Sequence, residues 1–219
     1  MKIVSYNISS CTQDKVEQLF KLNADVYVVP EIACENKIKL PNEDEYKMKW
    51  NSNYPNKGLG VIWRENMKIK PADCYNEKLH YAIPLVYDDI FIIGFWPTKL
   101  QKNEKYKDIA LDILRYYAPY FTPKTIITGD FNLFFKDSNH EADITPIKDF
   151  PEEKGFKSLY HGNNIEFGSE KVATYYHQFK KTQPFFLDYT FTNFSVSSFE
   201  LKDFGRKFSD HVGQILCIK

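Results

Sequence analysis

The stretch TIITGDFN, residues 125–132, decides how this chain folds and where its polar residues gather. Its first four residues are β-branched, and such a short run followed by turn residues predicts a buried strand. Gly129, Asp130 and Asn132 follow at once, and these residue types favour turns. A carboxylate flush against a buried strand is costly unless it is paired. The stretch therefore indicates either a plain turn or one wall of a polar cavity.

Other predicted strands also border on polar residues. Outward from residues 125–132, apolar runs predict strands at 2–7, 26–29, 58–63 and 90–96, and further apolar stretches occupy 185–191 and 212–218. Asn7 closes the first run, and Pro30-Glu31 ends the second. Asp188 lies within 185–191, and Asp210-His211 directly precedes the last stretch. Several such side chains in one chain suggest a shared cavity in which they satisfy one another or a metal ion.

Two amphipathic helices accompany these strands. Thr12 is the predicted N-cap of a helix that carries Val16 and Leu19 on one face, and residues 105–117 form the second helix. Residues 137–168 are rich in turn-forming residues. Helices interspersed with strands fit sheets packed on each other with helices outside, although periodicity alone does not distinguish two sheets from one.

The composition is that of a folded globular protein. Apolar residues make up 43% and charged residues 26% of the chain, which excludes a disordered chain and a membrane protein. No linker interrupts the 219 residues, so we expect a single domain spanning 1–219. A net charge of zero does not favour tight nonspecific binding to DNA, because such binding usually relies on a positive excess.

The sequence carries no sign of export or of a structural metal. No apolar run approaches the roughly 20 residues that span a bilayer, and residues 1–10 lack the apolar region of a secretory signal. We therefore expect a cytoplasmic protein with no membrane partner. The cysteines are far apart and form no Cys-x-x-Cys pair, so neither a zinc site nor a redox motif is indicated.

Each polar residue taken alone also fits a structural role. Asn7 fits an Asx-turn, Glu31 fits a helix N-terminal acid, and His211 fits a core histidine bonded to its neighbour Asp210. Residues 129–132 alone fit a plain turn. The whole set, in its order along the chain, favours a shared site.

Five short motifs make up that set: Tyr6-Asn7, Pro30-Glu31, Gly129-Asp130-Phe131-Asn132, Leu187-Asp188-Tyr189 and Ser209-Asp210-His211. They resemble the signature of the endonuclease/exonuclease/phosphatase superfamily, also called DNase I-like, across nearly the whole chain. A further segment is similar to a small bacterial branch of it, through Ser158-Leu159-Tyr160-His161, Gly168, Glu170, Thr174 and Tyr176-His177. The resemblance implies a four-layer α/β sandwich of two packed mixed β-sheets flanked by helices, with the site at one edge.

The resemblance also implies metal-dependent hydrolysis of a phosphoester bond. Such hydrolysis needs an attacking water, charge relief on the nonbridging oxygens and stabilisation of the leaving oxygen. Glu31 is the expected ligand of Mg²⁺, or alternatively of Mn²⁺, because hard cations prefer carboxylate oxygen. Asn7 is expected among the catalytic residues and as a second metal ligand, and Asp210 is expected in the metal region.

The remaining motif residues are assigned by resemblance to the water and the phosphate. Asp130 is expected to orient or deprotonate the attacking water, and Asn132 to contact the phosphate. His211 would bind or protonate a phosphate oxygen, with Asp188 accepting its other ring N–H. This pairing predicts that the pKa of His211 lies above its usual value of about 6.5.

The chain departs from the superfamily at two positions. Many members have Tyr or His where this chain has Phe95-Trp96-Pro97, which offers no hydroxyl or imidazole to a phosphate. Some abasic-site nucleases have Asp where Ser9 stands, so a second metal ligand is not available there. Trp96 and His177 are expected substrate contacts, although Trp96 also fits a structural aromatic, and His177 and His161 also fit surface or loop histidines.

The substrate expected from the resemblance is a phosphodiester in nucleic acid or a nucleotide, hydrolysed by a monomeric nuclease. The superfamily uses one core on DNA, RNA, nucleotides, inositol phosphates and sphingomyelin, so the fold does not fix the substrate. A phosphatase, a phospholipid or inositol phosphoesterase, and a catalytically inactive binding module stay open as alternatives. Endonuclease and exonuclease action are equally open.

Overall fold

Two mixed sheets form the centre of the protein. The computed structural model describes residues 1–219 except 43, 80, 137–139, 181, 183 and 206. In spatial order, the first sheet contains β13 (Ser198–Lys202), β14 (Gly213–Cys217), β1 (Lys2–Ser5), β2 (Val26–Ile32), β4 (Lys57–Arg64) and β3 (Tyr46–Tyr54). The second contains β5 (Ile69–Pro71), β6 (Ala82–Tyr87), β7 (Ile90–Phe95), β8 (Lys124–Asp130), β12 (Asp188–Thr192) and β9 (Lys157–Ser158). A separate pair is formed by β10 (Tyr175–Tyr176) and β11 (Pro184–Phe185).

The two sheets pack face to face through side chains that alternate along each strand. In β1, Ile3 belongs to the core between the sheets and Val4 to the outer face. In β7, Ile92 faces the core between the sheets and Ile93 the outer face of the second sheet. Strands that are buried on both faces need apolar residues at consecutive positions. This double burial explains the uninterrupted apolar runs in the sequence.

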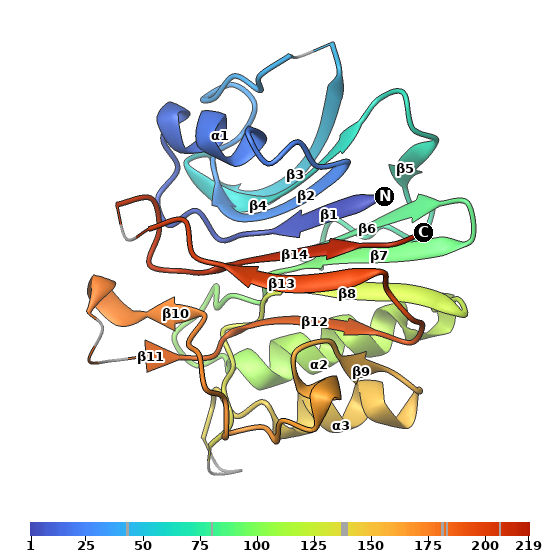
Figure 1. Cartoon of the computed structure of the whole chain (residues 1–219), viewed down its shortest axis with the longest axis vertical. Coiled ribbons are helices and arrows are strands. Elements are labelled where there is room, and N and C mark those ends of the chain that lie inside the picture. The colour runs from blue at the N-terminus through green and yellow to red at the C-terminus, as the bar shows by residue number, and fades with distance from the viewer. Residues whose placement is uncertain (43, 80, 137–139, 181, 183, 206) are drawn as a thin grey trace.

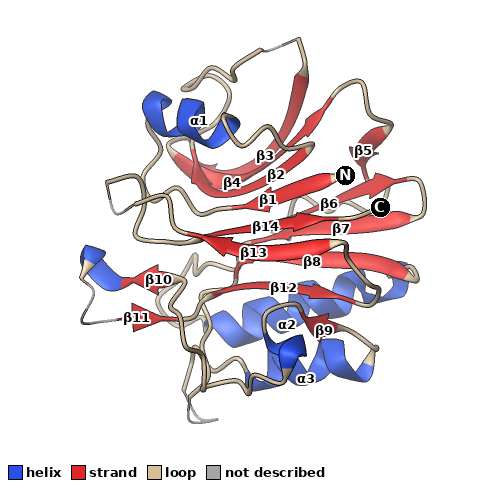
Figure 2. Ribbon diagram, in the orientation of Figure 1, coloured by secondary structure: helices blue, strands red, loops and turns tan. Residues whose placement is uncertain are grey.

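Helices cover the outer faces of both sheets. They are α1 (Gln13–Phe20), α2 (Tyr106–Tyr117) and α3 (Thr145–Glu153), with short 3₁₀ segments η1 (Ala118–Tyr120), η2 (His161–Asn163) and η3 (His177–Phe179). Leu19 of α1 packs on the first sheet, and Leu114 of α2 and Ile147 of α3 pack on the second. Figures 1 and 2 show α1 on one side of the sheets and α2 and α3 on the other. The predicted four-layer α/β sandwich, two packed mixed sheets flanked by helices, is confirmed.

Local structure differs from the expectation in three places. Strand β2 does not end at Pro30-Glu31 but continues past it through a shift of register, which is a β-bulge. Thr12 is the N-cap of α1, but its side chain makes no capping hydrogen bond. The turn-rich region 137–168 contains α3 and β9, while residues 137–139 of that prediction lie outside the described residues. None of the helices in the described residues has the length and apolar character needed to cross a bilayer.

Strand directions bring several strand ends to one edge. Strands β1 and β2 are parallel and β14 is antiparallel to β1, so the carboxyl ends of the first two lie beside the amino end of the third. In the second sheet β7 and β8 are parallel, and antiparallel β12 places Asp188 opposite Asp130. Gly129 permits the close approach of β8 to β7, because a Cβ atom there would lie 1.7 Å from the carbonyl oxygen of Phe95.

Candidate active site

Asn7 joins the two sheets at this edge. It is fully buried, just beyond the end of β1. Its Nδ2 donates to Asp130 Oδ2 at 2.9 Å and lies 3.3 Å from Glu31 Oε1. Its Oδ1 accepts the backbone N–H of Ser9 at 2.9 Å, so the Asx-turn and the contact with the carboxylates coexist. Two carboxylates from different sheets therefore meet at one amide group.

Glu31 sits at the bulge of β2 in a strained conformation. Its φ angle is +65°, a region that costs a non-glycine residue roughly 1–2 kcal/mol. A bulge re-aims a side chain. The carboxylate of Glu31 accepts the backbone N–H of Ser10 at 3.3 Å and forms an ion pair with Lys57 Nζ at 3.1 Å. The ammonium group of Lys57 thus contacts Glu31, the carboxylate that is expected from the sequence to bind a metal ion.

Asp130 ends β8 and is buried in the site. Its Oδ1 accepts the backbone N–H of Asn132 at 2.9 Å. Asn132 has a φ angle of +53°, and its side-chain amide donates to the carbonyl oxygen of Pro97 at 3.0 Å. Burial raises the pKa of Asp130 to about 7, and the neighbouring His211 offsets part of that increase. A carboxyl group with this pKa can exchange a proton with water at neutral pH.

His211 is buried and pairs with Asp188. Its Nδ1 donates to Asp188 Oδ2 at 2.9 Å. Its Nε2 lies 3.9 Å from Asp130 Oδ2, beyond hydrogen-bond distance, and makes no hydrogen bond within the described part of the chain. Burial alone would lower the pKa of His211, but Asp188 and then Asp130 raise it to about 9. The imidazole therefore carries a positive charge at neutral pH. The pKa is raised, as expected from the sequence.

Two hydroxyl groups hold this pair in place. Thr174 Oγ1 accepts the backbone N–H of Asp188 at 3.0 Å. Burial raises the pKa of Asp188, and hydrogen bonds with His211 and with Thr174 lower it in part. Ser209 Oγ accepts the backbone N–H of His211 at 3.0 Å and donates to the backbone oxygen of Asn7 at 2.6 Å. The segment that carries His211 is thereby fixed to the end of β1.

Asp210 presents an unsatisfied oxygen. Its Oδ1 is buried and has no hydrogen-bond partner within the described residues. Asp210 and Glu31 both act electrostatically on Lys15 and on Tyr175, so the two carboxylates face a common region. A buried carboxylate oxygen without a partner calls for an explanation, and a bound cation is one.

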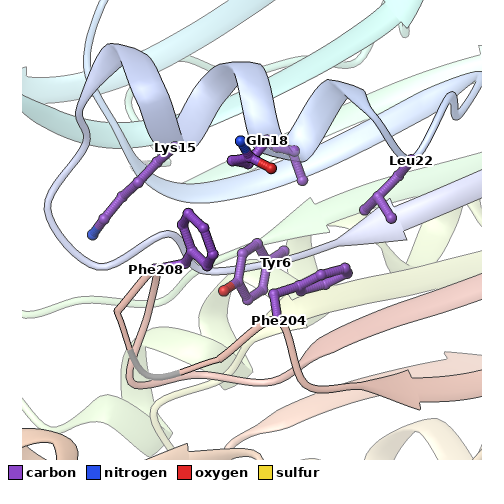
Figure 3. A pocket seen from close by; sticks show the side chains of 7 residues that line it. Tyr6, Lys15, Gln18, Leu22, Phe204 and Phe208 are labelled. Atoms are coloured by element: carbon purple, nitrogen blue, oxygen red, sulfur yellow. The ribbon is translucent and has the colours of Figure 1, made fainter.

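An apolar pocket lies between α1 and two phenylalanines of the segment that precedes Asp210 (Figure 3). The cavity measures about 140 Å³ and is lined by Tyr6, Lys15, Gln18, Leu19, Leu22, Phe204 and Phe208. Lys15 extends from α1 and donates to the backbone oxygen of Ile8 at 2.8 Å. Helix α1 therefore supports both loops of the site, the one after Asn7 and the one before Asp210.

The two expected substrate contacts differ in accessibility. Trp96 is only 3% exposed and packs edge-on against Tyr81, with ring centroids 4.9 Å apart. So little exposed area leaves no face for stacking on a base, and the structural alternative fits Trp96 better. His177 is exposed, and its Nδ1 lies 2.9 Å from the hydroxyl of Tyr175. His177 therefore reaches the site through another side chain.

His161 is not the surface or loop histidine considered from the sequence. It is buried, with Nδ1 2.8 Å from Ser158 Oγ and Nε2 3.0 Å from Glu170 Oε1. Its ring stacks on Phe167 at 3.7 Å between centroids. Both ring nitrogens are thus engaged inside the protein, away from the carboxylates of the site.

Two sets of side chains have the composition of a cation site. The ligand atoms of Asp130, Asp188 and His211 lie within 4.8 Å of one another. A protonated His211 has no lone pair to offer, however, and Asp188 already accepts its N–H. Oxygen donors from Glu31 and Asp210, with the partnerless Asp210 Oδ1 among them, fit a hard divalent cation better. The expected ligand Asn7 instead turns its amide nitrogen towards Glu31, and its oxygen accepts the Ser9 N–H.

Most residues selected from the sequence lie at one edge of the sandwich. The structure brings together Asn7, Glu31, Asp130, Asn132, Asp188, Asp210 and His211, while Trp96 is buried and His177 is exposed. Three further residues near the site were not assigned a role: Lys57, Thr174 and Tyr175. The last two adjoin His177 in a segment already singled out, which could have drawn attention to them. Lys57 follows a hairpin turn and gives no sequence signal.

Comparisons with known proteins bear on this fold. The sequence matches no protein-family model and no curated protein. An AP endonuclease from Archaeoglobus fulgidus is similar in structure, with a TM-score of 0.74 and 16% identity over 100% of this chain and 99% of that one. The 3' phosphatase NExo from Neisseria, bound to a product DNA hairpin, gives a TM-score of 0.74 and 13% identity over 100% and 99%.

A third similar structure carries the superfamily's own description. An endonuclease/exonuclease/phosphatase family protein from Leptotrichia buccalis gives a TM-score of 0.62 and 18% identity over 100% of this chain and 99% of that one. Identities this low establish the fold rather than the activity. The full-length similarity shows that the chain has the same fold as these proteins, one of which is described as an endonuclease/exonuclease/phosphatase family protein.

Proposed function

We propose that this chain is a divalent-metal-dependent phosphodiesterase that cleaves its substrate with an activated water. One observation carries the proposal. The Asn7 amide contacts Glu31 at 3.3 Å and Asp130 at 2.9 Å, and His211 lies 3.9 Å from Asp130. Side chains this close can serve one cation and one phosphate together. The DNase I-like fold supports the same class of chemistry.

Asp130 acts on the attacking water. Its Oδ2 lies between the Asn7 amide and the His211 ring, so its orientation is fixed before substrate binds. With a pKa of about 7, a large share of Asp130 is unprotonated at neutral pH and can accept the proton of the water. The Asn132 amide has a second N–H beyond the one given to Pro97, and that N–H serves a phosphate oxygen.

His211 supplies positive charge on the other side of the phosphate. Its Nε2–H is directed into the site and donates to a nonbridging or leaving oxygen. Asp188 keeps the other proton on Nδ1 and fixes the ring, as an orienting carboxylate does in a catalytic triad. A preorganised donor of this kind contributes roughly 10²- to 10³-fold to turnover.

Glu31 and Asp210 are the residues that would hold the metal, and the amide of Asn7 orients Glu31 beside it. Mg²⁺ fits their oxygen donors, and Mn²⁺ is the alternative. The bound ion would relieve negative charge on the phosphate oxygens and on the leaving oxygen. Because Lys57 now pairs with Glu31 at 3.1 Å, its ammonium group competes for the same carboxylate.

Nucleic acid or a nucleotide is the proposed substrate. The similar structures include an AP endonuclease and a phosphatase bound to a DNA hairpin, which supports phosphoesters of DNA. A phosphatase acting on terminal phosphates is the second candidate, favoured by that 3' phosphatase. A binding module without activity is disfavoured, because Asn7 contacts both Glu31 and the base Asp130, and His211 lies 3.9 Å from that base. A monomer in the cytoplasm stays a prediction.

A substrate panel tests this assignment. Duplex DNA, single-stranded DNA and RNA, a 3'-phosphorylated oligonucleotide and an inositol polyphosphate are incubated with protein and Mg²⁺, and products are separated by mass. Cleavage of internal or terminal phosphodiester bonds is expected. Release of inorganic phosphate alone would select the phosphatase. Activity on inositol phosphates with none on oligonucleotides would replace the nuclease by an inositol phosphoesterase.

A further inference from the structure

The two residues directly after β7, Trp96 and Pro97, offer no side-chain hydroxyl or imidazole to a phosphate. Phe95 is fully buried, Trp96 is 3% exposed, and Pro97 has no N–H to give. The carbonyl oxygen of Pro97 already accepts the Asn132 amide. The first hydroxyl in this segment belongs to Thr98, which is half-buried, and another part of the chain brings a second one.

Tyr175 brings a hydroxyl to the site from a different segment. Its ring packs on His211, with centroids 4.7 Å apart and planes at 39°, and its backbone forms an isolated β-bridge with His211. Burial raises the pKa of Tyr175 to about 12, and the carboxylates of Asp210, Asp130 and Glu31 add to that increase. The hydroxyl therefore keeps its proton at neutral pH. The carboxylates of Asp210, Asp130 and Glu31 lie close enough to act on it electrostatically.

His177 is a hydrogen-bond partner of this hydroxyl. Its Nδ1 lies 2.9 Å from the oxygen of Tyr175, and its ring is exposed to solvent. When Nδ1 carries a proton, it donates to the Tyr175 oxygen and leaves the phenolic O–H free to point elsewhere. The residue expected from the sequence to contact substrate thus acts on a neighbour instead.

We infer that Tyr175 donates a hydrogen bond to the substrate phosphate in place of the side chain missing after β7, and that His177 is a positioning residue for it. This inference rests on the proposed phosphoesterase function. Tyr175 reaches the phosphate beside His211, so that two donors flank the group on which Asp130 directs the water. No covalent step is assigned to Tyr175.

The test uses Tyr175→Phe, which keeps the ring on His211 and removes only the hydroxyl. We expect kcat/KM for bis-p-nitrophenyl phosphate with Mg²⁺ to fall roughly 10- to 100-fold, the range for one hydrogen bond to a charged group. Inhibition by inorganic phosphate, a readout that reports binding, should weaken as well. Tyr176→Phe is the matched control, because it removes a hydroxyl from the next residue, on the opposite side of β10. The control should leave both quantities unchanged.

His177 gives a second, independent variant on the protein surface. His177→Phe should lower kcat/KM by less than Tyr175→Phe, and His177→Gln, which keeps a hydrogen-bonding group, should recover part of the loss. Wild-type kcat/KM and phosphate inhibition in Tyr175→Phe would overturn the inference and leave the phosphoesterase intact. A wild-type protein that neither hydrolyses the ester nor binds phosphate would overturn the proposed function, and the role of Tyr175 with it.

Discussion

Two buried histidines, His211 and His161, have similar partners and different surroundings. Each has a carboxylate on one ring nitrogen, Asp188 at 2.9 Å and Glu170 at 3.0 Å. His161 also has a hydroxyl, Ser158 Oγ, 2.8 Å from its other nitrogen. His211 instead turns its Nε2 towards Asp130 at 3.9 Å, without a hydrogen bond to any described residue.

The difference shows what separates a structural histidine from a candidate catalytic one. A carboxylate partner fixes the ring in both cases, so the carboxylate by itself says little about function. At His161 every polar atom of the ring is satisfied and Phe167 covers one face. At His211 one nitrogen is left 3.9 Å from the carboxyl group of Asp130, and Asp210 also raises the pKa of the ring. A buried donor without a partner is unfavourable unless a ligand completes it.

Replacing each histidine by glutamine should separate the two roles, and this is the largest effect expected from comparing the two histidines. His211→Gln should lower turnover of bis-p-nitrophenyl phosphate roughly 10²-fold or more, because it removes the positive charge beside the phosphate. His161→Gln should leave turnover within about threefold and lower the free energy of unfolding by roughly 1–3 kcal/mol, since a buried hydrogen-bonded group is disturbed. Urea denaturation supplies the second measurement. Equal losses of turnover in both variants would remove the distinction between the two histidines.

Cation binding should depend on Glu31 at the candidate site and not on Glu170 beside His161. Calorimetry of the wild-type protein with Mg²⁺ should show one binding event, and Glu31→Gln should weaken it roughly tenfold or more, because a hard cation needs the anionic oxygen. Glu170→Gln, the matched change beside His161, should leave the affinity unchanged. Lys57→Met should strengthen binding severalfold, since it removes the ammonium group from Glu31. Unchanged affinity in Glu31→Gln would take this residue out of the metal site.

The smallest of these effects is the dependence of activity on pH, which follows from the positive charge on His211. Because its pKa is raised to about 9, the protonated form is present at neutral pH and is lost as pH rises through that value. Activity should therefore decline on the alkaline side near pH 9. Asp188→Asn removes the principal partner that raises this pKa, so the decline should move to lower pH. An NMR titration of the ring in EDTA checks the pKa directly, and an unchanged value in Asp188→Asn would contradict the account.

The four-layer sandwich was predicted from the resemblance of five short motifs to the superfamily, because periodicity alone did not distinguish two sheets from one. Asn7, Asp130 and His211 stand at the ends of apolar runs, so their positions follow from strand boundaries and from the order of the motifs. Trp96 shows the limit of that argument. A tryptophan at the end of a strand fits the core and a binding surface equally well, and only the packing of Tyr81 against it decides.

Other features depend on geometry that local sequence does not encode. The bulge at Glu31 was not predicted because Pro30 and a charged residue normally end a strand. Helix α3 was not predicted because Pro151 lies inside it, and proline disfavours a helix interior. Lys57 reaches the site through the register of the β3 and β4 hairpin, and Tyr175 through an isolated bridge to His211, which precedes β14.

The central claim is that Glu31, Asp130 and His211 act on one phosphate with one divalent cation. Hydrolysis of bis-p-nitrophenyl phosphate by the wild-type protein and by Asp130→Asn, each with Mg²⁺ and with EDTA, tests it most directly. We predict turnover by the wild type that requires Mg²⁺, and a rate roughly 10²- to 10⁴-fold lower in Asp130→Asn. Background rates that are equal in both proteins, with or without the metal, would contradict the claim and leave the fold as a binding module.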